Sequence, residues 1–225
     1  MVSRFFPPAE QADENDLVLV GGRLTSEWLL DAYRHGIFPW PMWGDWMPMT
    51  WFSLDPRAII PLDGLYVSSR LKRTIRSGKF QVTCNKAFRE VMLGCSKPRH
   101  LKDGTWITPA MIKAFCRLHG EGHAHSVEVW HEGELAGGIY GVSVGGAFAG
   151  ESMFHNVRDA SKVALVALVS HLNARGYQLF DIQQWTPHTG SMGAIEIDRS
   201  DYLALLKQLV DLPVTFGSEL APILP

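Results

Sequence analysis

The chain has 225 residues, of which 46% are hydrophobic and 20% are charged, and its formal net charge is −2. This composition is typical of a globular protein with one large domain, or with a small domain packed on a larger one. The weak negative charge excludes a global signature of nucleic-acid binding, so any RNA contact must depend on a local patch. Three cysteines without a CxxC motif argue against a disulfide framework or a zinc knuckle. With no membrane-spanning stretch and no signal-peptide pattern, the sequence predicts a cytoplasmic protein.

Residues 1–56 are predicted to form a small N-terminal α/β domain. Residues 1–16 are polar and contain prolines, which favours an extended arm. Thr25 is a suitable N-cap for a helix over 26–35 that ends at Gly36. The next 25 residues are rich in tryptophan and proline, and the prolines exclude a continuous helix or a central strand. We expect an ordered aromatic loop, or the wall of a cleft, in this region.

Residues 57–225 are predicted to form a second, larger α/β (α+β) domain. In chain order we first expect a basic helix from Ser68 or Ser69, a strand over 79–85, a helix over 86–95 and a helix capped by Thr108 and ended by Gly120. Three strands follow, over 125–130, 135–144 and 147–154. The chain then continues with a helix capped by Asp159 and ended by Gly176, a strand over 177–184 and a final helix from Ser200. The alternation of period two, with a turn at Gly145–Gly146, predicts an antiparallel meander. A helix and one more strand complete a mixed sheet, a topology compatible with the acyl-CoA-dependent N-acetyltransferase superfold (GNAT-like).

A CoA cofactor is not expected, because the glycine-rich loop that would hold its pyrophosphate is missing. Only HNVR stands between Phe154 and Asp159, just before the central helix.

Two of the predicted strands end on polar side chains: Glu151 in one, Asp181 and Gln183 in the other. Asp181 and Gln183 are two residues apart, so on a regular strand they point to the same face. The carboxylate would then accept the amide N–H, and the amide oxygen would accept a hydrogen bond from a substrate amine. From the residues alone, a structural polar pair is the better interpretation for Asp181 and Gln183, and a solvated or paired surface residue for Glu151.

Other candidate groups give weaker signals. His123 and His125 share a strand face but lack further ligands at a metal-binding spacing, so we expect no metal site. His188, in the loop sequence TPHTG, is a weak candidate for an acid/base group. One basic run indicates either a solvated helix face or a phosphate-binding patch; it comprises Arg70, Lys72, Arg73, Arg76 and Lys79, with Arg57 upstream. A leucine stripe that includes Leu165 and Leu168 indicates core, or the floor of an apolar pocket.

Taken in order, the motifs resemble one family. They are GGxLTxEWLLxAYRxGIFPW, SxDPRAxxP, GTWIT, RLHxxGHAHSVEVW, GGxYGVxxGxxFxGESMF, ASKxAL and DxQ…HTxSxGA, from about residue 17 to residue 205. They resemble the leucyl/phenylalanyl-tRNA–protein transferase family. The resemblance implies transfer of Leu or Phe, and less well Met, from aminoacyl-tRNA to the N-terminal amine of proteins that begin with Arg or Lys, which marks them for N-degron proteolysis.

The resemblance also implies roles for individual residues. Asp181 and Gln183 match the catalytic pair, and Glu151 matches an active-site acid that holds either the substrate's α-amino group or the acceptor's basic end. The aminoacyl pocket falls on Ile139, Phe148, His155, Leu165 and Leu168, and the aromatics around the terminal adenosine are Trp40 and Trp106. Because the net charge of the chain is negative, we also expect tRNA to bind at the basic run, Arg70 to Lys79.

Three positions depart from the commoner family pattern. Thr186 stands where Asn is frequent, Phe115 where Tyr is common, and His155 where a Ser lies at the pocket. The last two bear on the preference among Leu, Phe and Met, not on the reaction. We expect a monomer that acts on aminoacyl-tRNA and acceptor proteins, with no membrane partner and no metal, CoA or ATP. Two rival functions are an acyl-CoA-dependent N-acetyltransferase and a non-catalytic RNA-binding module.

Overall fold

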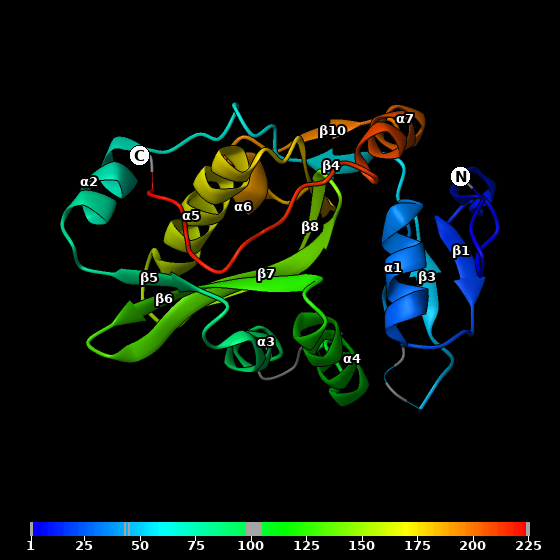
Figure 1. The fold of residues 1–225 in the computed structure, drawn as a ribbon, viewed down its shortest axis with the longest axis horizontal. Helices are drawn as coiled ribbons and strands as arrows, with labels where there is room; N and C mark the ends of the chain where they lie inside the picture. The colour runs from blue at the N-terminus through cyan, green and yellow to red at the C-terminus, as the bar shows by residue number, and fades with distance from the viewer. Residues whose placement is uncertain (1, 43, 45, 98–104, 224–225) are drawn as a thin grey trace.

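The protein forms two β-sheets, described by a computed structural model for residues 2–223 except 43, 45 and 98–104 (Figure 1). The smaller sheet has the strand order β1-β3-β2 and is antiparallel. The N-terminal part of the chain, which forms this sheet, contains a 3₁₀ turn at Ala9–Gln11, β1 (Leu17–Val20), α1 (Ser26–Arg34), β2 (Phe38–Pro39) and β3 (Thr50–Phe52).

The larger sheet has seven strands in the order β10-β4-β9-β8-β7-β6-β5. Its strands are β4 (Arg57–Ile59), β5 (Gln81–Cys84), β6 (Ala124–His131), β7 (Glu134–Val144), β8 (Ala147–His155), β9 (Leu179–Gln183) and β10 (Ile195–Ile197). The pairs are antiparallel except for β8 and β9, which run parallel. The predicted two-part α+β organisation with a mixed sheet is therefore confirmed.

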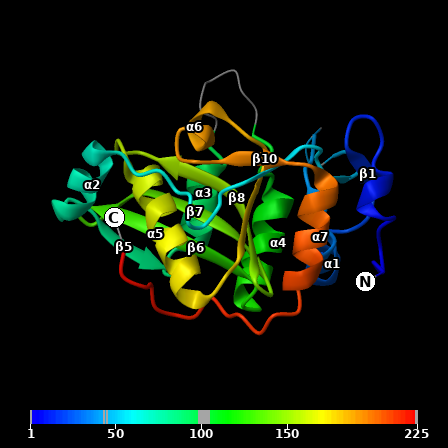
Figure 2. The same cartoon turned by 90° about the horizontal axis from the view of Figure 1, so that it is seen from above.

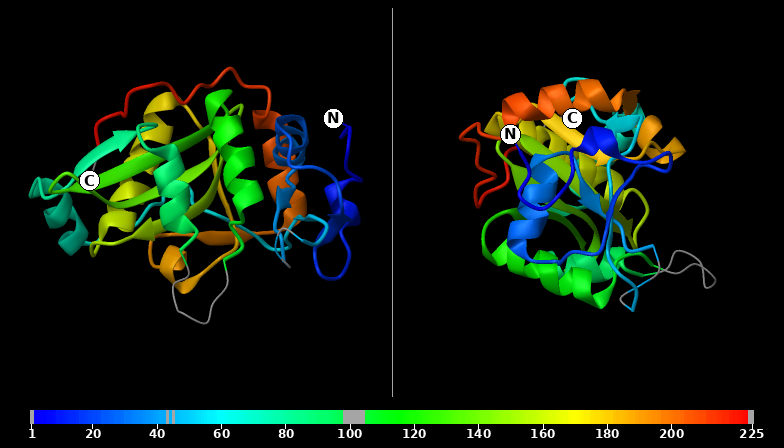
Figure 3. Two further views of the ribbon diagram at one scale, coloured as in Figure 1. Left: turned by 90° about the horizontal axis from the view of Figure 1, so that it is seen from below. Right: turned by 90° about the vertical axis from the view of Figure 1, so that its right-hand side faces the viewer.

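Six helices accompany the larger sheet in the described part of the chain. They are α2 (Ser69–Arg76), α3 (Phe88–Cys95), α4 (Pro109–Gly120), α5 (Ala160–Arg175), α6 (Pro187–Gly190) and α7 (Arg199–Leu209). Figures 2 and 3 show α5 on one face of β6, β7 and β8, with α3 and α4 on the opposite face. Helix α5 is buried along most of its length, as expected for a helix that is apolar on nearly every side. No helix among the described residues is long and apolar enough to cross a bilayer.

Several sequence predictions at element ends are confirmed. The hydroxyl of Thr25 accepts a hydrogen bond from Trp28 N at the start of α1, and Thr108 caps α4 with Pro109 in its first turn. Ser68, the first of the two candidates, caps α2. These side chains satisfy backbone N–H groups that a helix leaves without partners in its first turn.

Two other predictions at element ends are confirmed only in part. Asp159 stands at the N-cap position of α5 in the left-handed region with φ 72°, and its side chain makes no cap hydrogen bond. Its carboxylate instead accepts from Arg70 Nη2 at 2.7 Å. The last helix begins at Arg199, one residue before the predicted Ser200, with Asp198 at its N-cap.

The proline-rich region contains strands that the prolines do not prevent. Strand β3 is the central strand of the smaller sheet, and β4 lies between β10 and β9 in the larger one. Each has three residues, so it fits between the prolines. The predicted N-terminal arm is likewise not free, because Phe6 and Ala9 are buried in the core.

The chain passes from one sheet to the other between Phe52 and Arg57. One buried apolar cluster holds side chains of both parts, among them Leu29 of α1 and Met111 of α4. The two sheets therefore share a core, and the domain boundary between residues 56 and 57 stays a prediction.

Candidate active site

A cavity of about 730 Å³ lies where the two sheets meet. Its walls come from β2 with the residue that follows it, from Cys95 and Lys97 at the end of α3, from Trp106 before α4, from the middle of β7 and β8, from α5, and from the end of β9 with α6. Three of the polar groups predicted from the sequence are brought together here. Glu151 and Gln183 line the cavity, and Asp181 lies in β9, two residues before Gln183.

Asp181 is buried and its carboxylate accepts four hydrogen bonds. Oδ1 accepts from Arg57 Nε at 2.9 Å and from the backbone N–H of Gln183 at 2.9 Å. Oδ2 accepts from Arg57 Nη2 at 2.7 Å and from the Tyr202 hydroxyl at 2.9 Å. A carboxylate has about four lone-pair sites, so its acceptor capacity is filled.

Arg57 is the partner of Asp181 and joins separate parts of the chain. The side chain is 1% exposed, and its Nη1 donates to the Gly36 carbonyl at 3.1 Å. Its guanidinium lies over the rings of Phe38 and Tyr202, 4.9 and 4.5 Å from their centroids. Burial alone would lower the pKa of Arg57, but the adjacent Asp181 carboxylate raises that pKa above its ordinary value.

Sequence reasoning missed this role, because it placed Arg57 upstream of the basic run. The signal that could have found it is its place in the apolar segment RAIIP. A charged side chain in a buried strand needs an opposite charge beside it.

The expected side-chain contact between Asp181 and Gln183 is not what the structure shows. Gln183 has a left-handed backbone with φ 57°, so the alternation of a regular strand stops at this residue. Asp181 binds the backbone N–H of Gln183, not its side-chain amide. With the amide oriented to satisfy its neighbours, Nε2 donates to the carbonyls of Gly150 at 2.9 Å and Ile182 at 3.0 Å. Both amide N–H groups are thus used, and the oxygen is the atom left to accept from a ligand.

Glu151 is presented by a β-bulge. In the β7–β8 pair Tyr140 faces Ser152 and Gly141 faces Gly150, so Glu151 has no partner on β7. A bulge of this kind re-aims a side chain near a functional site. The carboxylate accepts a hydrogen bond from the Tyr33 hydroxyl of α1 at 2.7 Å. Burial raises the pKa of Glu151 from 4.5 to about 8.

The predicted substrate-binding residues divide into two groups. Trp40, Trp106, Ile139, Leu165 and Thr186 line the cavity. The two tryptophan rings lie 6.2 Å apart between centroids, at 44° to each other. Thr186 also caps α6 through a reciprocal pair of hydrogen bonds with Thr189.

The other four residues are not among the described lining of the cavity. Phe148 and Leu168 lie in the same buried cluster as Ile139 and Leu165. Phe115 packs edge-to-face on Tyr140 in the other buried cluster. His155 is exposed at the end of β8, with its Nδ1 3.3 Å from the Ser161 hydroxyl.

The basic run lies on and just after α2. Arg70 pairs with Asp159, while the other members form no ion pair within the described part of the chain and are exposed or half-buried; they are Lys72, Arg73, Arg76 and Lys79. Among the described residues no group of three or more His, Cys, Asp or Glu side chains is arranged to hold a metal ion.

We predict that Arg57→Met lowers the free energy of unfolding by about 3–5 kcal/mol, because it leaves a buried carboxylate without its opposite charge. The matched control is Arg70→Met, which breaks an arginine–aspartate pair whose arginine is 49% exposed. That change should cost about 0–1 kcal/mol. Denaturant unfolding of both variants measures the difference, and equal losses would contradict the prediction.

We also predict a pH-dependent gain in stability for Glu151→Gln. Because the pKa of Glu151 is about 8 when folded and 4.5 ordinarily, the folded protein binds this proton more tightly than the unfolded chain. The contribution of Glu151 to stability is therefore greatest below pH 4.5 and falls as the pH rises towards 8. The variant should become progressively more stable than the wild type over this range.

Unfolding curves between pH 5 and 8 test this, with Glu134→Gln as the control for loss of one exposed negative charge. Parallel curves for the wild type and Glu151→Gln would show that the carboxyl titrates as it does in solvent.

Comparisons with known proteins place both parts of the chain in one family. The family described as "Leucyl/phenylalanyl-tRNA protein transferase" matches residues 59–207, and the N-terminal domain of the same family matches residues 22–55. Two solved structures have a TM-score of 0.41 with this chain. They are L-PGS from Bacillus licheniformis (12% identity, 73% of this chain and 55% of that chain) and a GCN5-related N-acetyltransferase from Kribbella flavida (8% identity, 74% and 58%).

Curated relatives are much closer. The leucyl/phenylalanyl-tRNA–protein transferase of Magnetococcus marinus is 50% identical over 217 residues, which cover 94% of this chain and 91% of the relative. That of Chromohalobacter salexigens is 49% identical over 222 residues, which cover 98% and 85%. With this identity over nearly its whole length, the chain belongs to the leucyl/phenylalanyl-tRNA–protein transferase family.

Proposed function

We propose that this protein transfers Leu or Phe, and less well Met, from aminoacyl-tRNA to the N-terminal amine of proteins that begin with Arg or Lys. The product carries a destabilising N-terminal residue that directs it to N-degron proteolysis in the cytoplasm. The observation that carries the proposal is the Gln183 amide, whose N–H groups are both used by backbone carbonyls. Its oxygen is therefore available to an amine in a cavity that also holds Glu151.

The reaction needs no energy source beyond the aminoacyl ester. The acceptor nitrogen attacks the ester carbonyl, the C–N bond forms, and the C–O bond to the tRNA ribose breaks. The ribose oxygen leaves as a hydroxyl with the proton that the amine loses. Alignment of the two reactants can supply about 7–11 kcal/mol of the barrier reduction.

Gln183 orients the attacking amine in this proposal. A carboxamide is a feeble base, so its oxygen accepts a hydrogen bond from the amine and aims the nitrogen lone pair at the ester carbon. A ribose hydroxyl of the tRNA itself passes the proton from the amine to the leaving ribose oxygen. Asp181 holds Gln183 in place by accepting a hydrogen bond from its backbone N–H.

Glu151 suits either of the two roles expected for it. Its pKa of about 8 is close to the ~7.7–8.0 of an α-amino group, so a proton can pass between the two at little cost. Arrival of an ammonium or guanidinium group would also favour the ionised carboxylate. The α-amino group of the aminoacyl substrate and the basic side chain of the acceptor's N-terminal residue both carry such a charge.

The remaining cavity walls suit the aminoacyl-adenosine end of the tRNA. Trp40 and Trp106 present two tilted rings on which the terminal base can stack. Ile139 and Leu165 line an apolar part of the cavity for the Leu or Phe side chain, with Phe148 and Leu168 in the same buried cluster.

The test of the function is transfer of radiolabelled Leu, Phe and Met from charged tRNA to a peptide that begins with Arg. The same peptide with an acetylated N-terminus is the control. We expect transfer of Leu and Phe to the free amine and none to the blocked one. Absence of transfer would overturn the proposal, and tight acetyl-CoA binding would favour the N-acetyltransferase instead.

Gln183→Ala should lower kcat on the order of 10²-fold, because the amine is no longer aligned. Binding of charged tRNA should persist, since the tryptophans and the basic helix are untouched. Gln178→Ala, at an exposed position just before β9, is the matched control. A Gln183→Ala enzyme with the wild-type kcat would remove Gln183 from the mechanism.

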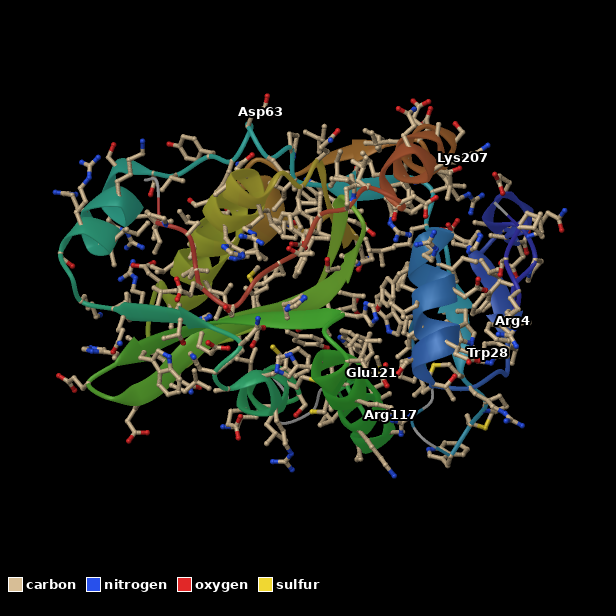
Figure 4. All side chains as sticks on the ribbon, in the orientation of Figure 1. Arg4, Trp28, Asp63, Arg117, Glu121 and Lys207 are labelled. Atoms are coloured by element: carbon tan, nitrogen blue, oxygen red, sulfur yellow. The ribbon has the colours of Figure 1, made fainter. Side chains whose placement is uncertain are left out.

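Lys72, Arg73, Arg76 and Lys79, with Arg70, form the proposed tRNA patch. The double change Arg73→Glu and Arg76→Glu should weaken tRNA binding and reduce the slope of log affinity against log salt by about 1 to 2. A control with the same charge change is Lys113→Glu with Arg117→Glu on α4, where Figure 4 shows Arg117 far from α2. Equal effects of the two double variants would show that net charge, not this patch, governs binding.

A further inference from the structure

We propose that Tyr202 of α7 is a positioning residue for this reaction: through Asp181 it holds the left-handed turn that aims the Gln183 amide. The inference rests on the proposed function and deepens it. Helix α7 contributes no residue to the described lining of the cavity. Any effect of Tyr202 on the reaction must therefore pass through the groups that it contacts.

Asp181 has no acceptor site left for a substrate. All four of its acceptor sites are filled, by Arg57 twice, by Tyr202 and by the N–H of Gln183. Its side chain is 3% exposed. A carboxylate in this state has no lone pair for a substrate proton, so it influences the reaction through the groups that it holds.

The turn at Gln183 connects the Asp181 carboxylate with the side-chain amide of Gln183. Gln183 has φ 57°, a conformation that a residue with a Cβ adopts only when its surroundings impose it. The N–H of Gln183 points back to Asp181 Oδ1 in this turn. The same turn lets the side-chain amide reach the carbonyls of Gly150 and Ile182. Release of the N–H would therefore also release the amide.

Tyr202 contacts both members of the buried Arg57–Asp181 pair. Its hydroxyl lies 2.9 Å from Asp181 Oδ2, with Arg57 Nη2 at 3.3 Å, and its ring covers the guanidinium. Gly36, whose carbonyl binds Arg57, lies directly against α7. A Cβ at Gly36 would stand 2.9 Å from Tyr202 Cε1. The tyrosine is thus fixed in place, and its hydroxyl completes the set of donors around Asp181.

The experiment compares Tyr202→Phe with Tyr177→Phe. Tyr177 is a matched control, because it is also buried and its hydroxyl lies 2.6 Å from Ser143 Oγ, while it is absent from the described cavity lining. Transfer to the Arg-initiated peptide gives kcat and KM for each variant. Hydrogen exchange of the Gln183 backbone N–H reports on the turn and can be measured without enzyme activity.

We expect Tyr202→Phe to lower kcat by about tenfold, because the variant loses the hydrogen bond from the Tyr202 hydroxyl to the charged Asp181 carboxylate. KM for charged tRNA should stay within about twofold, because no tRNA contact changes. Hydrogen exchange of the backbone N–H of Gln183 should accelerate by about tenfold in Tyr202→Phe and stay unchanged in Tyr177→Phe.

A purely structural role would lower the stability of both variants and leave kcat per folded molecule unchanged. Wild-type kcat, or wild-type exchange at Gln183, in Tyr202→Phe would overturn the inference. If the wild-type protein itself transferred no amino acid, the proposed function would fail, and the exchange data would still decide whether Tyr202 holds the turn.

Discussion

The buried ion pair between Arg57 and Asp181 is the interaction on which the site depends. Its two charges are almost completely removed from water, at 1% and 3% exposure. Such burial is tolerated only when every remaining donor and acceptor finds a partner. Here Gly36, Tyr202 and the Gln183 N–H supply those partners. The pair therefore brings β4, β9, α7 and the segment after α1 to one point.

This arrangement makes the N-terminal part of the chain a component of the site. Tyr33 of α1 binds Glu151, and Phe38 packs on the Arg57 guanidinium while also lining the cavity. Trp40 follows directly in the chain and lines the same cavity. A site made from both sheets needs them in a fixed relation, and the shared apolar core provides it.

The sequence was sufficient for the frame of the molecule but not for the contacts inside the site. Helix ends with Thr25, Ser68 and Thr108 were predictable because a cap acts on its own helix within three residues. The partners of Asp181 were not, because Arg57 lies 124 residues away and only the fold brings it close. The assumption of a regular strand failed at Gln183, where the backbone turns left-handed. Nor did the sequence reveal the bulge that presents Glu151, since alternation of side chains carries no mark of one extra residue.

A double-mutant cycle at Arg57 and Asp181 tests the central claim most directly. Arg57→Met and Asp181→Leu each leave one buried charge, so each variant should lose stability and transfer activity. The double variant replaces the pair by apolar side chains and should recover much of the lost free energy of unfolding. Because Gln183 is then no longer held, we predict that transfer stays abolished. Wild-type transfer in a stable double variant would contradict the account.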